Sequence, residues 1–153
     1  MFELSQIDPV DRGPAVELGS VKMVELPQFG DDRGMLIPLE EGEHFLFPVR
    51  RVYYIFDTKP GIVRGHHAHK VLKQLLICVS GSCVVDVEIR PGDRASYVLD
   101  KPTVGLQVEG LVWREMRNFS EGAVLVVLAD GLYDAADYVR DYDEFVALSE
   151  RIA

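Results

Sequence analysis

Short runs rich in valine, isoleucine, leucine and tyrosine follow one another from Val21 to Asp130, and glycine, proline or aspartate separates them. Runs of this kind, interrupted about every 8 to 12 residues, are typical of β-strands. The pattern predicts strands over residues 21–26, 35–39, 51–56, 62–69, 74–79, 83–89, 95–99, 104–108, 112–117 and 124–129. So many short strands in a chain of 153 residues predict two packed antiparallel sheets, an all-β jelly roll, in a single domain over residues 1–153.

The pattern changes after Gly131, where apolar residues recur at steps of three and four. This spacing places one apolar stripe on a helix. The stripe contains Tyr138, Tyr142, Phe145, Val146, Ser149 and Ile152. We therefore expect a short carboxy-terminal helix that packs against the sheets.

The charge of the chain limits its partners, because 25 acidic and 16 basic residues give a net charge of −9 at pH 7. Such a field repels nucleic acid polymers and anionic membrane surfaces. A small anionic ligand stays possible where a few arginines gather in one cleft. The first residues, MFELSQIDPVDRGP, lack the basic start and apolar stretch of a signal peptide, and no apolar run approaches the roughly 18 residues of a membrane span. We expect a cytoplasmic protein.

Three of the four histidines fall in the segment RGHHAHK, which begins at Arg64 and lies inside a predicted strand. Side chains alternate along a strand, so His67 and His69 should share one face and Arg64 and His66 the other, unless Gly65 carries a bulge. The histidines could simply lie on the surface of an edge strand. Two imidazoles on an inner face, in contrast, are costly unless they are hydrogen-bonded or used.

A His-X-His pair on a jelly-roll strand also suggests a metal site, because imidazole is the commonest metal ligand in proteins. Gln74, five positions beyond His69, stands where a cupin metal site normally has a carboxylate, and no histidine follows His69. Carboxamides bind transition metals poorly, so we expect no metal. Imidazoles with a pKa near 6.5 are instead suited to proton transfer, and the simplest reaction for them is enolisation beside a carbonyl.

Several separated motifs, in this order along the chain, resemble those of the sugar 3,4-ketoisomerases, which act on thymidine-diphosphate-4-keto-6-deoxyglucose. The resemblance covers roughly residues 21 to 145. The motifs are RVYYIFDT from Arg51, RG at Arg64, HAHK from His67, Gln74, SGS from Ser80, VW at Val112, EM at Glu115, YD at Tyr133 and DYVR from Asp137.

The resemblance implies a cupin-type double-stranded β-helix, a homodimer with exchanged amino-terminal strands, and catalysis without metal or cofactor. It identifies His67 and His69 as the catalytic pair. Arg64 matches the arginine of the Arg-Gly motif, and Arg33 lies in the matching Asp-X-Arg-Gly turn. Arg114 stands where some members have histidine, so the resemblance does not specify the substrate contact at this position.

The expected reaction follows from carbonyl chemistry, because the C3 hydrogen of the 4-keto sugar is acidic. Its removal gives an enediol, and return of a proton to C4 leaves the ketone at C3. As a hypothesis, His69 handles the carbon-bound proton and His67 moves the oxygen-bound proton.

Six further residues are candidates for substrate binding. Two arginines, Arg33 and Arg64, can pair with the oxygens of a diphosphate. Two aromatic residues, Trp113 and Tyr133, could stack on the thymine or the sugar. The remaining candidates are Tyr53 and Gln74. Gln74 could hydrogen-bond the sugar or orient a histidine. Each aromatic residue could instead belong to the core, and Arg33 could lie in a solvated turn.

Three other functions stay open at this point. A nucleotide-sugar 3,5-epimerase abstracts protons beside the same ketone, using a histidine with a carboxylate partner and a tyrosine acid. A non-catalytic sugar-nucleotide-binding cupin would use the histidines only to hold its ligand. A metal-dependent cupin oxygenase would need ligands that the sequence does not offer. The His-X-His pair favours the isomerase.

Overall fold

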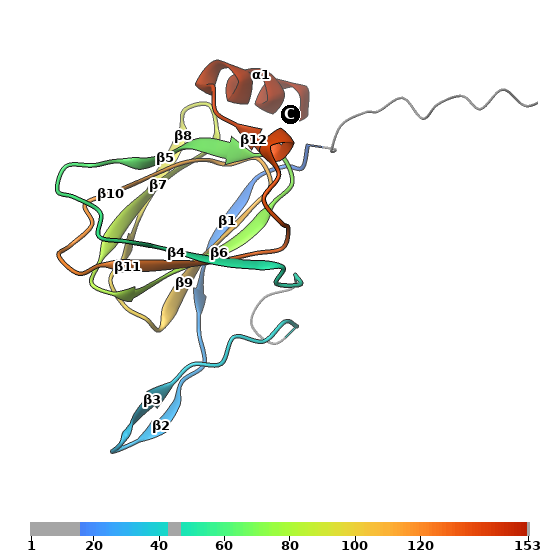
Figure 1. Cartoon of the computed structure of the whole chain (residues 1–153). Helices are drawn as coiled ribbons and strands as arrows, with labels where there is room; N and C mark the ends of the chain where they lie inside the picture. Colours follow the sequence, from blue (N-terminus) through green and yellow to red (C-terminus); the bar gives the residue numbers. More distant parts are fainter. Residues whose placement is uncertain (1–15, 43–46, 153) are drawn as a thin grey trace, which may run out of the picture.

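Two five-stranded antiparallel sheets face each other, and one helix lies over the outer side of the second sheet (Figure 1). The computed structural model describes residues 16–42 and 47–152. The first sheet contains, in spatial order, β1 (Ser20–Glu25), β9 (Val104–Glu109), β6 (Lys73–Ser80), β11 (Val124–Ala129) and β4 (Arg51–Phe56). The second contains β12 (Tyr138–Val139), β5 (Arg64–His69), β10 (Trp113–Arg117), β7 (Cys83–Arg90) and β8 (Asp93–Leu99). The expected all-β fold is confirmed.

The core lies between the two sheets, where side chains of alternating strand positions meet. Leu76, Val85, Leu106 and Leu125 are among the buried residues of this layer. Burial of one such side chain stabilises the fold by about 1.5 to 3 kcal/mol. In β7, for example, Cys83, Val85 and Val87 alternate along the strand and face this layer.

The carboxy-terminal helix forms as expected but begins later than the apolar stripe suggests. Helix α1 spans Tyr142–Ile152, and the Asp141 carboxylate accepts a hydrogen bond from the Asp143 N–H at 2.8 Å, which caps its first turn. Tyr138 has extended backbone angles and lies in β12, after the short 3₁₀ helix η1 (Ala135–Asp137). Its spacing from Tyr142 is therefore not helical, and including Tyr138 in the helix was wrong.

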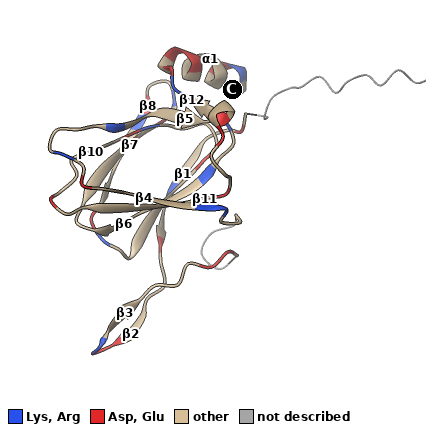
Figure 2. Cartoon of the chain, in the orientation of Figure 1, with Lys and Arg blue, Asp and Glu red and all other residues tan. Residues whose placement is uncertain are grey.

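A two-stranded hairpin, β2 (Phe29–Asp31) and β3 (Gly34–Leu36), projects away from the sheets (Figure 1). The expected strand at residues 35–39 is shorter and begins one residue earlier. The three-residue strand β2 was missed because it has no apolar alternation. Figure 2 shows basic and acidic residues together at the tip, where Arg33 pairs with Asp31 at 2.6 Å.

Within the two described ranges, no helix combines the length and the hydropathy that a membrane crossing requires. The cytoplasmic location was inferred from the first residues, which lie outside the described residues, and it stays a prediction. A single domain over residues 1–153 stays a prediction for the same reason.

Candidate active site

A bulge near the start of β5 determines how the histidine segment faces. Gly65 has a φ of +92° and His66 a φ of +56°, and the pairing of β5 with β10 shifts register beside Glu115. A Cβ on residue 65 would lie 2.9 Å from a backbone oxygen of β10, which explains the glycine. His66 is turned outward to Glu115, with Nδ1 2.8 Å from the carboxylate. The bulge places Arg64 and His67 in the lining of the same pocket. This corrects the expectation from strict alternation, which put the two side chains on opposite faces of the strand.

Beyond the bulge, alternation holds and divides β5 between two environments. Ala68 faces outward into the apolar cluster under α1, together with Trp113. The Trp113 ring lies edge-on to Tyr142, with centroids 5.4 Å apart. This position agrees with the core alternative for Trp113, and its role in substrate binding stays a prediction. His67 and His69 face inward, in edge contact at 4.9 Å between ring centroids.

An open pocket of about 430 Å³ lies on the inner side of β4 and β5. Among its charged lining residues are three arginines, Arg51, Arg64 and Arg140, and its described lining includes no aspartate or glutamate. Its described lining is Arg51, Tyr53, Tyr54, Ile55, Arg64, Gly65, His67, Met116, Tyr138 and Arg140. The pocket is therefore suited to an anionic ligand, although the chain as a whole is acidic.

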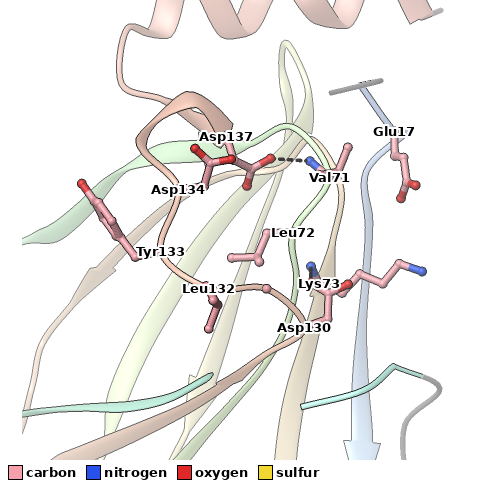
Figure 3. A pocket seen from close by; sticks show the side chains of 10 residues that line it. Glu17, Val71, Leu72, Lys73, Asp130, Leu132, Tyr133, Asp134 and Asp137 are labelled. Atoms are coloured by element: carbon pink, nitrogen blue, oxygen red, sulfur yellow. Dashed lines mark hydrogen bonds between the residues drawn. The ribbon is translucent and has the colours of Figure 1, made fainter. Parts of the chain in front are cut away.

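A second pocket, of about 530 Å³, has the opposite electrostatic character (Figure 3). Its charged lining residues are Glu17, Lys73, Asp130, Asp134 and Asp137. Four carboxylates and one lysine disfavour a diphosphate. The arginine-lined pocket is therefore the candidate active site, and Asp137 lines the acidic pocket.

The two histidines lie at different depths. His67 is on the wall of the pocket, whereas His69 is 1% exposed and lies behind it. The Tyr138 ring contacts both, with its centroid 5.0 Å from that of His67 and 4.4 Å from that of His69. The three rings therefore form one cluster, of which His67 and Tyr138 line the pocket.

Asp137 fixes the orientation and the tautomer of His69. Its Oδ2 atom lies 3.0 Å from His69 Nδ1, and its Oδ1 atom accepts the Val71 N–H at 3.0 Å, the bond drawn in Figure 3. Burial raises the pKa of Asp137, but the bonds from His69 and the backbone outweigh it and the net pKa is lowered. An ionised carboxylate only accepts, so Nδ1 carries the proton and Nε2 is the basic nitrogen. His69 Nε2 is buried, and no described residue hydrogen-bonds to it.

Both imidazoles are held neutral. Burial, followed by the positive charge of Arg114 and by His69, lowers the pKa of His67 to about 3. Burial also lowers the pKa of His69, to about 4, although the Asp137 hydrogen bond opposes it. Neutral imidazoles can accept a proton at pH 7, so the pair is prepared to act as base before it acts as acid.

Gln74 lies deeper in the barrel and contacts neither histidine in a hydrogen bond. It accepts a hydrogen bond from Arg114 through Oε1 and donates one to the Tyr53 hydroxyl at 3.1 Å. The two roles considered for Gln74, binding the sugar or orienting a histidine, stay predictions, and its observed partners are Arg114 and Tyr53. Tyr53 lines the pocket, where its part in substrate binding also stays a prediction.

The last two candidate binding residues, Tyr133 and Arg33, lie in different parts of the molecule. Tyr133 lines the acidic pocket and not the arginine-lined one, with its ring centroid 5.6 Å from that of Tyr138 and 5.9 Å from the Arg51 guanidinium (Figure 3). Arg33 lies at the tip of the projecting hairpin, with its side chain 90% exposed and paired with Asp31. Within one chain, Arg33 therefore lies away from the histidines. This position agrees with the alternative that Arg33 belongs to a solvated turn.

Sequence reasoning missed several residues of the site. Asp137, Tyr138 and Arg140 lie in the motif DYVR, but nothing in its spacing shows that it meets a strand 68 positions earlier. The guanidinium of Arg140 lies 4.2 Å from the Tyr138 ring centroid. The available signals were its place among the motifs that resemble the ketoisomerases and its position shortly after the apolar strand β11.

Metal binding receives no support from side-chain geometry. In the part of the chain that the structure describes, no three histidine, cysteine, aspartate or glutamate side chains gather as ligands would. Catalysis without a metal stays a prediction, which metal analysis of the purified protein can test.

The comparisons with known proteins agree with this site. Residues 19–150 match the family model described as "FdtA: WxcM-like, C-terminal". A relative from Aneurinibacillus thermoaerophilus, TDP-4-oxo-6-deoxy-alpha-D-glucose-3,4-oxoisomerase, is 46% identical over 125 residues, which are 81% of this chain and 88% of the relative. The chain belongs to the sugar 3,4-ketoisomerase family.

Solved structures of sugar 3,4-ketoisomerases share the fold closely. QdtA from Thermoanaerobacterium thermosaccharolyticum, solved in complex with TDP, is 39% identical with a TM-score of 0.84, and the match covers 86% of this chain and 96% of QdtA. WlaRB from Campylobacter jejuni, a TDP-quinovose 3,4-ketoisomerase, is 47% identical with a TM-score of 0.79 and coverage of 83% and 97%. The cupin-type fold expected from the family is confirmed.

A sugar epimerase is also similar in structure, but at a lower level. NovW from Streptomyces spheroides, a 4-keto-6-deoxy sugar epimerase, has a TM-score of 0.65 at 20% identity and covers 77% of this chain and 67% of NovW. This likeness shows that the fold is shared and does not favour epimerisation over ketoisomerisation.

Proposed function

We propose that this chain is an isomerase that moves the ketone of a thymidine-diphosphate-4-keto-6-deoxyhexose from C4 to C3, in deoxysugar biosynthesis. The observation that carries the proposal is the pair of neutral, inward-facing imidazoles beside an arginine-lined pocket, in a chain of the ketoisomerase family. QdtA has also been solved as a histidine-to-asparagine variant with TDP-4-keto-6-deoxyglucose, which supports this substrate class.

The depth of the two histidines suggests the reverse of the order expected from sequence. A base must touch the C3 hydrogen, and His67 lies on the pocket wall whereas His69 lies behind it. We therefore assign the carbon-bound proton to His67. His69, with Nδ1–H held by Asp137, offers a basic Nε2 that can move the proton between O3 and O4. The electrons of the C3–H bond form the enediol double bond, and a proton delivered to C4 then completes the shift.

Substrate binding is assigned from the charges of the lining. Arg51, Arg64 and Arg140 line the pocket, and their guanidinium groups can pair with diphosphate oxygens. Tyr133 lines the neighbouring acidic pocket, and its contact with the ring of Tyr138, which lines the arginine-lined pocket, supports a role in stacking on the thymine or the sugar. A diphosphate at this position would leave the sugar near His67.

Incubation with the thymidine-linked 4-keto sugar in deuterium oxide, followed by NMR of the product, tests the function. We expect the ketone at C3 and solvent deuterium at C4. A protein that only binds the nucleotide sugar would leave the sugar free of deuterium. The coupling pattern at C4 also distinguishes a galacto from a gluco product.

One observation favours a second candidate, the 3,5-epimerase. The buried His69–Asp137 pair, with Tyr138 beside it, is the combination of histidine, carboxylate and tyrosine expected of such an enzyme. In the same experiment, an epimerase would place deuterium at C3 and C5 and leave the ketone at C4.

We also propose that the enzyme is a homodimer. The hairpin exposes Phe29, Met35 and Leu36, and the edge strand β4 exposes Val52, Tyr54 and Phe56. Apolar faces of this kind on a projecting hairpin and on a sheet edge favour a second copy as occupant. In such a dimer, Arg33 can reach the pocket of the partner subunit, which would account for its distance from its own.

Mixed dimers test whether Arg33 acts on the partner's site. Arg33→Ala should raise KM about 10-fold or more, the effect of losing one hydrogen bond to a charged group. A dimer of one Arg33→Ala chain and one His67→Asn chain should regain one intact site and about half the wild-type kcat at the wild-type KM. If Arg33 served its own chain, both sites of the mixed dimer would be impaired, and about half the wild-type kcat would appear only at the raised KM of Arg33→Ala.

Asp137→Asn should lower kcat by about 10²-fold, because an amide can present either an oxygen or an N–H to His69 and no longer fixes the tautomer. The Val71 N–H can keep its acceptor, so the thermal unfolding midpoint should change little. Asp134→Asn is the matched control, since Asp134 caps η1 in the same loop without contacting a histidine. Equal kcat values for the two variants would contradict this role of Asp137.

A further inference from the structure

The arginine-lined pocket has one apolar section, which is formed by Ile55 and Met116. Every other side chain in its described lining belongs to an arginine, a tyrosine or a histidine. Ile55 lies on β4 in the first sheet and Met116 on β10 in the second, so each sheet contributes one apolar side chain. The pocket therefore combines a part suited to an anion with a part that a diphosphate does not need.

This apolar section is continuous with the core between the sheets. Met116 is 5% exposed and belongs to the core cluster, and Ile55 packs against the same cluster. Side chains in a close-packed interior keep well-defined positions. Neither side chain has a strong hydrogen-bonding group, because a thioether sulfur is only a weak acceptor. The section is therefore preformed and complementary to an apolar group of a ligand.

The apolar section lies beside the histidine that we assign to the C3 proton. Met116 is opposite Arg64 in the pairing of β10 with β5. A Cβ on residue 65 would lie 3.3 Å from the methyl carbon of Met116, so the end of this side chain reaches the backbone at Gly65. Gly65 and His67 both line the pocket and are separated by one residue. A sugar that contacts His67 is thus next to Met116.

A 6-deoxyhexose carries one apolar substituent, the methyl carbon C6 on C5. C3 and C5 both flank the ketone carbon C4, so a ring that presents C3 to His67 holds its methyl group a short distance away in the same pocket. A hydroxymethyl group in this position would place a hydroxyl against Ile55 and Met116. Burial of a hydroxyl without a hydrogen-bond partner is unfavourable.

We propose that Met116 and Ile55 form a subsite for the C6 methyl group and so select 6-deoxy sugars against their 6-hydroxy counterparts. The inference rests on the proposed isomerase function and names the feature by which the pocket recognises its substrate class. The preference should be about 10 to 10²-fold in affinity, because an apolar site rejects an added hydroxyl only to this extent.

Two nucleotide sugars that cannot react test the preference in the wild-type protein. TDP-glucose and TDP-6-deoxyglucose lack the ketone and differ only at C6, so calorimetry measures binding without turnover. We expect the 6-deoxy compound to bind about 10 to 10²-fold more tightly. Equal Kd values for the two compounds would overturn the proposal.

Met116→Gln assigns the preference to the subsite. Glutamine has a similar length and offers an amide to the 6-hydroxyl, so the two Kd values should come within about 3-fold of each other. Met116→Leu is the matched control, because it is apolar and of similar volume and should keep the preference. TDP alone should bind equally to all three proteins. Weaker binding of TDP to Met116→Gln, with the preference unchanged, would place Met116 at the thymine end and reject the subsite.

A second pair of variants covers the case in which Met116→Gln does not fold. Ile55→Thr introduces a hydroxyl and should reduce the preference, whereas Ile55→Val has almost the same shape and should keep it. An unchanged preference in Ile55→Thr would then reject the subsite. The function is tested separately by NMR in deuterium oxide. Turnover with equal Kd values would refute the subsite alone, and a preference without turnover would refute only the isomerase.

Discussion

Replacing His67 or His69 with asparagine should lower kcat by about 10² to 10⁴-fold, the range that general acid-base groups contribute. Asparagine fills a similar volume and cannot exchange a proton near neutral pH, so the fold should be kept. The measurements are the initial rate of ketone migration by NMR and the affinity for TDP by calorimetry. Near-wild-type turnover in both variants would end the assignment of the pair.

His66→Asn is the matched control, because His66 is adjacent in sequence and is turned outward to Glu115. It should keep wild-type kcat. The two inward variants can also be told apart in deuterium oxide. His67→Asn should lose exchange at the carbon positions. His69→Asn should keep slow exchange at C3 while ketone migration fails. The opposite result would restore the order expected from sequence, with His69 as the carbon base.

The free energy of unfolding should fall steeply between pH 6.5 and pH 4. Both histidines have a lowered pKa in the folded protein, about 3 for His67 and about 4 for His69, against about 6.5 in the unfolded chain. The unfolded state therefore binds protons first as the pH falls, and stability that is present above pH 6.5 is lost toward the folded-state values. The loss should be on the order of 3 kcal/mol for His69 alone, because each pH unit of pKa difference corresponds to about 1.4 kcal/mol.

Urea unfolding at a series of pH values measures this loss. The difference between wild type and His69→Asn isolates the contribution of His69 from that of the carboxylates. This difference in the free energy of unfolding should narrow by about 3 kcal/mol as the pH falls from 6.5 to 4. A constant difference across this range would mean that His69 titrates alike in the folded and unfolded states. The pH profile of kcat/KM should agree, with no loss of activity near pH 6.5 from these two groups.

Local patterns were sufficient for most of the strands and for the histidine pair, but not for the short strands β2 and β12. Strands β4 and β11 were predicted at both ends, because apolar β-branched and aromatic residues stand between clear turn residues. The i, i+2 spacing of His67 and His69 was enough to place them on one face. The start of α1 was misjudged, because Tyr138 stands four residues before Tyr142 by coincidence.

The partners of these residues could not be found in the same way. Asp137 meets His69 only because β12 pairs with β5, and Gln74 meets Arg114 only because the two sheets close around one interior. The bulge at Gly65 was foreseen as an option, but its effect on Arg64 depends on how β10 pairs beside it. These contacts join positions far apart in the chain, and no local period encodes them.

The sequence by itself determined an all-β domain with a carboxy-terminal helix and a pair of imidazoles fit for proton transfer, since alternation along a strand is a local property. Only the tertiary structure decided that those imidazoles are neutral, that His69 has a defined tautomer, and that arginines surround the pocket. Burial and charge at a site depend on which distant segments pack together, and that packing exists only in the folded chain.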